Sequence, residues 1–310
     1  MKKAIGILFI LGAALGFALM NLFVNLAGDL PLMQKVFFRN LIATFIVFFI
    51  LLFQKEKFRI QKGCLPWLTL RSVFGFVGVI LNFYAIDHIG SISDASILNK
   101  LSPFFAILFS MVLLKEKPRI WEIIFVVLAF VGAVFVVRPS FSVQALPAFS
   151  GFLSGACAGF AYVCVRILGN KGERSMMTVF FFSAFSTVIA LPFFLFGYQP
   201  MTAMQWLYLI CAGLSATLGQ FCITAAYRRA PAKEIAVFDY AQVLFAALLG
   251  YFFLAQIPDL YSYIGYAIII GAAVGKSVVQ LRISKSKQKM QKNKIGSAPS
   301  AAENGERDDE

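Results

Sequence analysis

Ten apolar segments, each long enough to cross a lipid bilayer as a helix, follow one another along most of this chain. The hydrocarbon core of a bilayer is about 30 Å thick, and a helix that crosses it needs about 20 mostly apolar residues. Short segments with Gly, Pro and polar residues separate the runs. The predicted spans are 4–25, 34–53, 65–86, 93–114, 119–138, 148–168, 176–197, 203–226, 234–254 and 260–281. The sequence therefore predicts an all-α polytopic membrane protein with ten transmembrane helices.

The composition agrees with a membrane protein and argues against nucleic acid as a partner. Hydrophobic residues make up 60% of the chain and charged residues only 14%, whereas soluble domains are about 45–50% apolar and 25% charged. The net charge of +13 comes from basic residues that lie between the apolar runs and in the C-terminal tail. Such a distribution indicates membrane topology rather than a nucleic-acid-binding stripe. The expected surroundings are a lipid bilayer.

No pattern in the sequence predicts an enzyme, a metal site or a cofactor. The five cysteines lie mostly within apolar spans and lack metal or redox spacing, and His88 is the single histidine. An intramembrane enzyme would need a nucleophile with a base, or a metal cluster, at membrane depth. The chain also lacks a phosphate-binding loop motif, which argues against direct drive by ATP.

The placement of lysine and arginine predicts that both termini are cytoplasmic. The N-terminus and alternate loops are basic, while the other loops hold only Lys35 and Arg138. Because cytoplasmic loops carry the excess of Lys and Arg, the basic side is the cytoplasmic one. Ten spans, an even number, agree with this. Residues 282–310 are polar and are predicted to form a disordered cytoplasmic tail.

The two halves of the chain resemble each other. Residues 12–18 match residues 155–161 at an offset of 143, and Tyr84 matches Tyr227 at the same offset. The expected units are 4–138 and 148–281. Each holds five spans, so the two copies must cross the membrane in opposite directions. Inverted repeats are typical of secondary transporters, whose substrate site lies between the halves near the midplane.

These residues make the chain resemble the drug/metabolite transporter superfamily, in its ten-span branch with two EamA-type repeats. The resemblance rests on the Gly/Ala-rich first span of each half, on Phe38-Arg39, on Ser102-Pro103 and on Lys115-Glu116. It implies that spans 1, 3 and 4 and spans 6, 8 and 9 line a central cavity that opens alternately to either side. Substrates of the superfamily range over amino acids, nucleotides, sugars, vitamins and drugs.

Polar residues inside the fourth and ninth spans predict where a solute binds. Asn99 and Lys100 lie within the fourth span, and Asp239, Tyr240 and Gln242 within the ninth. An ionisable side chain near mid-membrane costs about 2.5–3.5 kcal/mol, so it usually faces a cavity or a partner. Asn99 and Asp239 correspond at an offset of 140. The alternative is that Lys100 and Asp239 form ion pairs that only lock the bundle.

The third and eighth spans add three more candidates. Arg71 and Asn82 share one helical face with two glycines, and Gln220 lies on the corresponding face of the eighth span. The glycines and threonines of both faces are expected to serve helix packing. The three larger polar side chains favour substrate binding, since an unpaired polar group in lipid is costly.

If the fourth and ninth spans are straight α-helices that rise about 1.5 Å per residue, Lys100 and Asp239 lie at levels about 12 Å apart along the membrane normal. This difference in level predicts a basic outer layer with Arg39 and Lys100, and a mixed inner layer with Arg71, Asp239 and Tyr240. Such a cavity suits an amphoteric or anionic metabolite with an apolar part. Arg39 alone is more typical of a structural arginine that reaches the headgroups.

The expected function is secondary transport of a small polar or amphiphilic metabolite, similar to an amino acid, a nucleoside or a vitamin, across the cell membrane by alternating access. Asp239 is the candidate for proton coupling. The alternatives are a multidrug or toxic-metabolite exporter, a channel, and a structural membrane protein. The expected partners are the small-molecule substrate and the bilayer, with the chain as a monomer or weak homodimer.

Overall fold

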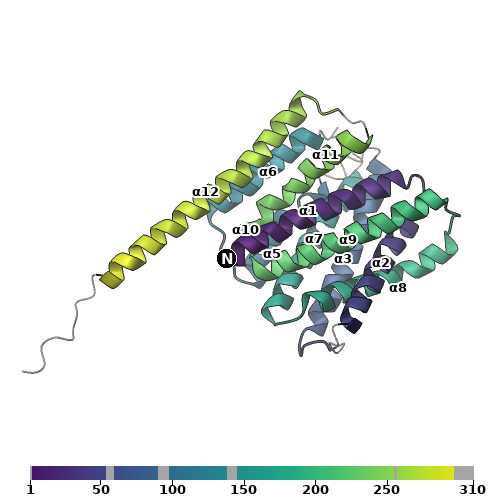
Figure 1. The fold of residues 1–310 in the computed structure, drawn as a ribbon, viewed down its shortest axis with the longest axis horizontal. Helices are drawn as coiled ribbons and strands as arrows, with labels where there is room; N and C mark the ends of the chain where they lie inside the picture. Colours follow the sequence, from purple (N-terminus) through teal and green to yellow (C-terminus); the bar gives the residue numbers. More distant parts are fainter. Residues whose placement is uncertain (1, 54–58, 90–97, 138–144, 255–256, 297–310) are drawn as a thin grey trace, which may run out of the picture.

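The computed structural model describes residues 2–53, 59–89, 98–137, 145–254 and 257–296. Figure 1 shows a bundle of helices that run side by side, with the N-terminus of α1 and the C-terminal part of α12 at the same end. The helices are α1 (Lys2–Leu26), α2 (Leu32–Phe53), α3 (Leu65–Ile89), α5 (Ser102–Leu113), α6 (Ile120–Val137), α7 (Ala145–Asn170), α8 (Ser175–Phe196), α9 (Ala203–Arg229), α10 (Ala232–Ile235), the 3-10 helix η1 (Ala236–Tyr240), α11 (Ala241–Leu254) and α12 (Leu260–Gly296).

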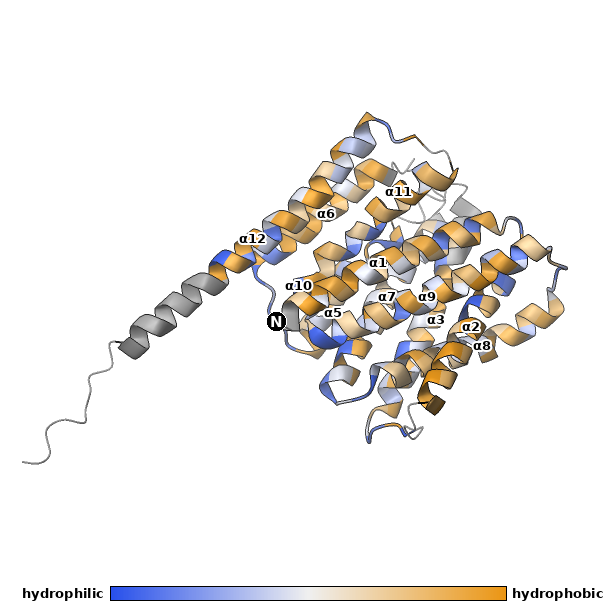
Figure 2. Cartoon of the chain, viewed as in Figure 1, coloured by the Kyte–Doolittle hydropathy of each residue, from blue (hydrophilic) through white to orange (hydrophobic). Residues whose placement is uncertain are grey.

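The all-α membrane architecture is confirmed. Among the described residues, eight helical segments are long and apolar enough to span a bilayer, and α5 and α6 are shorter apolar helices in the fourth and fifth positions. Figure 2 shows hydrophobic residues along most of the helices, with hydrophilic ones at turns and loops and at a few places within the helices. Large apolar side chains such as Phe196, which is 93% exposed, cover the outside. A bilayer is the solvent that accommodates such a surface.

The helix contacts repeat when the two halves are exchanged. Helix α1 packs mainly on α9, and its counterpart α7 packs mainly on α3. Helix α5 packs on α7, and its counterpart α11 packs on α1. The pairs α2 with α8 and α6 with α12 each join a helix to its own counterpart. The two five-helix repeats are therefore interleaved around a common centre rather than lying side by side as separate units.

Glycines allow the closest of these crossings. A Cβ atom at Gly16 of α1 would lie 2.7 Å from the backbone nitrogen of Gly219 on α9. A Cβ at Gly159 of α7 would lie 2.8 Å from the backbone nitrogen of Ala106 on α5. Small residues let backbones approach closely where lipid offers no hydrophobic drive for helix association. The Gly/Ala-rich first span of each half therefore takes part in close helix packing.

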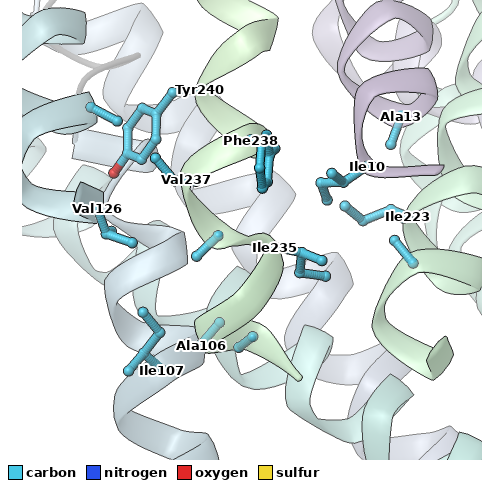
Figure 3. Packing of buried hydrophobic residues seen from close by; sticks show 14 of the residues in the cluster. Ile10, Ala13, Ala106, Ile107, Val126, Ile223, Ile235, Val237, Phe238 and Tyr240 are labelled. Carbon is cyan, nitrogen blue, oxygen red and sulfur yellow. The ribbon is translucent and has the colours of Figure 1, made fainter. Parts of the chain in front are cut away.

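The largest buried apolar cluster surrounds the segment from α10 to α11. Figure 3 shows Phe238 of η1 directed toward Ile10 of α1, while Tyr240 extends from the other side of the same segment. Ile235 and Val237 are fully buried in this cluster. The packing fixes η1 on both sides, which is why a 3-10 turn, normally short and weakly bonded, persists there.

Loops from both repeats meet at one end of the bundle, called the basic end here. The backbone N–H of Gln61 donates to Glu173 Oε2 at 2.9 Å, and Lys233 Nζ donates to the carbonyl of Lys117 at 2.8 Å. At the opposite end, Gln34 Nε2 donates to the carbonyl of Gln199 at 2.9 Å.

Three expectations about helix ends need correction. The fourth and ninth spans were expected to be continuous, but a turn at residues 100–101 separates the helical residues 98–99 from α5, and the ninth span is divided into α10, η1 and α11. Residues 93–97 of the predicted fourth span lie outside the described residues. Helix α12 continues to Gly296 through residues that were expected to be disordered. Lys and Gln are good helix formers, and extending an existing helix avoids the cost of nucleation. Residues 297–310 lie outside the described residues.

Candidate functional site

The fourth helix is interrupted at Lys100 because Pro103 cannot continue it. Proline has no N–H to donate to the carbonyl four residues earlier, here that of Asn99, and it is tolerated only in the first turn of a helix. Pro103 lies in the first turn of α5. In a continuous α-helix the backbone N–H of Phe104 would donate to the carbonyl of Lys100, but here it donates to Leu101 O at 3.0 Å. The interruption leaves the carbonyl of Lys100 free for a partner from another helix.

The ninth helix is interrupted at the matching place in the second repeat. Asp239 and Tyr240 lie in the 3-10 turn η1, immediately before α11 begins at Ala241. Both residues are buried, with Asp239 at 5% exposure. Discontinuous helices at corresponding positions of two inverted repeats are typical of transporter binding sites.

The two interruptions contact each other directly. Tyr240 Oη donates to the free carbonyl of Lys100 at 2.9 Å, and Lys100 Nζ donates to Gln242 Oε1 at 2.6 Å. Lys100 Nζ lies 3.7 Å from Asp239 Oδ2. The predicted separation of about 12 Å between Lys100 and Asp239 is therefore wrong. The estimate assumed straight α-helices and ignored the reach of the lysine side chain.

The hydroxyl of Tyr240 is expected to stabilise this junction. In Tyr240→Phe the ring stays packed, but the buried carbonyl of Lys100 loses its donor, which costs about 1–3 kcal/mol. The variant should unfold at a lower temperature than the wild type in a thermal-unfolding assay in detergent. Tyr198→Phe is the control, since Tyr198 is 48% exposed. Equal melting of Tyr240→Phe and the wild type would contradict the assignment.

A cavity of about 180 Å³ lies beside this junction. Its lining includes seven of the eight residues predicted to bind substrate: Arg71, Asn82, Asn99, Lys100, Gln220, Asp239 and Gln242. Tyr240 is the exception, because its side chain is fully buried against the cluster of Figure 3. The structure thus brings the predicted polar residues of four helices to one place, while their role in binding stays a prediction.

A side-chain hydrogen bond joins α3 and α9 in the wall of the cavity. Arg71 Nη2 donates to Gln220 Oε1 at 2.9 Å, and its guanidinium carbon lies 3.6 Å from the ring centre of Phe182. The remaining members of the predicted α9 face serve packing. Gly213 contacts Ile42, and Thr217 Oγ1 donates to the carbonyl of Gly213 at 2.7 Å.

Two asparagines extend the polar lining. Asn99 Nδ2 donates to Ser154 Oγ on α7 at 2.7 Å. The Oδ1 atom of Asn82 is buried and accepts no hydrogen bond from the described residues. A buried amide oxygen without a partner is costly, so Asn82 is suited to accept a hydrogen bond from a solute.

Several residues that line the cavity are not marked as binding residues by the sequence. Arg39, which alone was expected to be structural, lines the cavity and is 9% exposed. Tyr162 also lines the cavity and stacks on Tyr227 with ring centres 4.8 Å apart. Phe17 and Asn21 of α1 complete that wall. A tyrosine or phenylalanine in an apolar helix gives no sequence signal that separates cavity lining from core.

The cavity lies at an intermediate depth in the bundle, because Arg71 on α3 and Phe182 on α8 line it from the halves of those helices nearer the basic end, while α1 lines it from its other half. On α1 its lining residues are Phe17, Met20 and Asn21, near the end of the helix at Leu26. Toward the basic end, contacts between the repeats close the bundle. Arg166 Nε lies 3.6 Å from Glu116 Oε1. Burial raises the pKa of the Glu116 carboxyl group, and the charge of Arg166 opposes this shift.

The sequence model of the EamA-like transporter family matches residues 4–138 and again residues 145–277. The chain belongs to the EamA-like transporter family. It is thus a member of the drug/metabolite transporter superfamily with two EamA domains, as predicted, and a transporter rather than an enzyme.

Curated relatives of this EamA-like transporter cover nearly its full membrane domain. The pseudopaline exporter CntI of Pseudomonas aeruginosa is 34% identical over 278 residues, which are 88% of this chain and 95% of the exporter. A Helicobacter pylori protein named as an uncharacterized transporter is 30% identical over 86% of this chain and 92% of its own length. Human solute carrier family 35 member G1 is 27% identical over 89% of this chain and 81% of its own length.

A solved crystal structure supports the fold of this EamA-like transporter. It has a TM-score of 0.77 and covers 90% of this chain and 98% of the other chain, at 17% sequence identity. At that identity the likeness concerns the fold alone. Among the described residues, no group of three His, Cys, Asp or Glu side chains is placed to hold a metal ion.

Proposed function

We propose that this EamA-like transporter is a secondary carrier that exports a small polar or amphiphilic metabolite across the cell membrane by alternating access. The observation that supports this most is the cavity lined by both repeats beside the two interrupted helices. The name of the relative from Pseudomonas aeruginosa, a pseudopaline exporter, supports the direction of export. Since one chain supplies both halves of the cavity, a monomer or weak homodimer suffices.

The proposed orientation has the basic end, and with it both termini, in the cytoplasm. Loops with Lys62, Lys115, Lys117, Lys171 and Arg174 lie at that end of the helices. Positive charge near span ends favours the cytoplasmic side. In this orientation the contacts at the basic end, including the pair Glu116–Arg166, lie on the cytoplasmic side of the bundle and must separate for loading from the cytoplasm.

The size of the cavity favours a metabolite over a drug-sized solute. Pockets for drug-sized ligands measure about 300–1,000 Å³, while this cavity measures about 180 Å³. Contacts between the two repeats at the basic end favour a carrier over a channel with a continuous pore. Accelerated exchange by unlabelled solute on the far side is a property of carriers only, so counterflow distinguishes the two.

Export is tested first with cells that carry or lack the gene. Untargeted metabolomics of the medium should show at least one small metabolite that depends on the gene. Pseudopaline, which appears in the name of the relative from Pseudomonas aeruginosa, is the first compound to test in proteoliposomes reconstituted with the purified protein. Counterflow of any gene-dependent compound supports the proposal, while leak that unlabelled solute does not accelerate contradicts carrier transport.

Proton coupling is proposed to depend on Asp239. Carboxylates within membrane spans are typical members of proton relays in transporters, and Asp239 is buried in the wall of the cavity. An imposed pH gradient should drive flux of the identified cargo several-fold above equilibrium exchange in the wild type. Asp239→Asn should lose that gradient response, so that the flux remaining in the variant is the same with and without the imposed pH gradient. Gradient-driven flux that is the same in Asp239→Asn and wild type would exclude Asp239 as the coupling group.

A further inference from the structure

The charges that line the cavity do not balance among the described residues. Among the described residues that line the cavity, three are basic and one, Asp239, is acidic. The basic residues are Arg39, Arg71 and Lys100. Asp239 lies 3.7 Å from Lys100 Nζ and therefore compensates that lysine. No described carboxylate forms an ion pair with Arg39 or Arg71, so two guanidinium charges remain in the wall of the cavity.

Both guanidinium groups are deeply buried. Arg71 is 3% exposed and Arg39 is 9% exposed. The Nε atom of each is buried and donates to no described acceptor. A buried charge without a partner is costly, because the protein interior solvates a charge much less well than water does. The two arginines are therefore poised to bind a group of opposite charge.

Arg71 is held in position by neutral groups. Gln220 accepts one of its hydrogen bonds, and Phe182 stacks on its guanidinium plane. Gly75 lies one turn further along α3, and a Cβ there would come within 2.8 Å of Arg71 Nη1. The absence of a side chain at Gly75 gives the guanidinium its room. An amide, a ring and a glycine orient the arginine without neutralising it.

Arg39 reaches the same region from α2. Arg39, Arg71 and Tyr162 all line the same cavity of about 180 Å³. Two like charges near one another in a water-poor wall are stabilised by an anion that contacts both. Arginine is well suited to this, since its planar fork binds a carboxylate through two parallel hydrogen bonds.

We propose that Arg39 and Arg71, with Tyr162 beside them, form an anion subsite that binds a carboxylate of the transported solute. The pair Lys100–Asp239 forms the second part of the site, where a further carboxylate pairs with Lys100 or an amino group pairs with Asp239. The cargo class is then a small carboxylic acid with more negative than positive charge, either a dicarboxylate or an acidic amino-acid-like compound. This inference rests on the proposed transport function.

Binding in the absence of transport tests the subsite directly. The probes are succinate and succinamide, which have similar size and differ in charge. The melting temperature of the purified protein in detergent is measured at increasing concentrations of each probe. A ligand that binds the native state stabilises it by mass action, so the shift in melting temperature gives an apparent Kd. Succinate should raise the melting temperature of the wild type and succinamide should not.

Charge-neutralising variants identify the residues. Arg39→Gln and Arg71→Gln should each weaken succinate binding at least tenfold, and the double variant should abolish it. Arg119→Gln removes the same charge at an exposed position outside the cavity and should bind like the wild type. If a single variant fails to fold, Arg39→Lys and Arg71→Lys keep the charge, and their weakened binding tests the requirement for the arginine fork.

The outcomes separate this inference from the proposed function. Equal stabilisation by succinate and succinamide, no stabilisation by succinate, or equal succinate binding by the wild type and Arg39→Gln/Arg71→Gln would overturn the subsite. Succinate binding that needs both arginines, in a protein without counterflow of any gene-dependent compound, would keep the subsite and reject the carrier. Counterflow of a neutral or cationic cargo that is unchanged in Arg39→Gln/Arg71→Gln would keep the carrier and reject the subsite.

Discussion

Lys100→Met should abolish transport and lower the stability of the protein. The substitution keeps the length of the side chain but leaves Asp239 buried without the cation 3.7 Å away. Removing one partner of a buried ion pair costs up to about 3–5 kcal/mol, because the remaining charge is uncompensated. Gene-dependent export should fall by at least tenfold in cells, and the purified variant should melt at a lower temperature.

The double variant Lys100→Met/Asp239→Asn separates a structural from a transport role. With both charges removed, no uncompensated charge remains, and stability should return toward that of the wild type. Export should stay low, because the second part of the proposed site is gone. Export restored together with stability would show that the pair only locks the bundle. Lys62→Met, at an exposed position of the basic end, is the control for loss of a lysine.

Gly16→Leu should disrupt the crossing of α1 and α9. A Cβ at Gly16 would already lie 2.7 Å from the nitrogen and 2.9 Å from the Cα of Gly219, both backbone atoms that no side-chain rotation can move. The helices must separate, and overpacking of this kind costs about 1–3 kcal/mol or more. The melting temperature in detergent should fall by about 5 °C or more.

Gly271→Leu is the matched control for this prediction. A Cβ at Gly271 of α12 would meet nothing within 4 Å, and the residue is exposed on the outside of the bundle. The same substitution should therefore leave the melting temperature nearly unchanged. Similar melting temperatures for Gly16→Leu and Gly271→Leu would contradict the importance of the close crossing.

Hydropathy and repeat patterns predicted most of the fold. Spans such as α2 (Leu32–Phe53), predicted as 34–53, and α11, predicted to end at 254, agree closely with the structure. The order of ten spans in two repeats follows from local composition, since a bilayer forces every crossing segment to satisfy its own backbone hydrogen bonds. The ends were less predictable, as the extension of α12 to Gly296 shows.

The polar residues of the site could be selected from the sequence because they are rare within apolar spans. Lys100, Asp239 and Arg71 each stand out against their neighbours for that reason. Arg39 and Tyr162 were harder to assign. An arginine near a span end is compatible with the headgroup region, and a tyrosine is compatible with either core or cavity. Only their neighbours in space distinguish these cases.

The sequence by itself determined the class of the protein, the number and order of its spans and the pairing of residues between the repeats. Those features depend on local hydrophobicity and on internal similarity, which are properties of a linear chain. The tertiary structure alone decided that Lys100 contacts Asp239, Gln242 and Tyr240 across two interrupted helices, and that Arg39 joins Arg71 at one cavity. Helix interruptions and crossings are set by packing between residues far apart in the sequence. A distance along one helix cannot predict them.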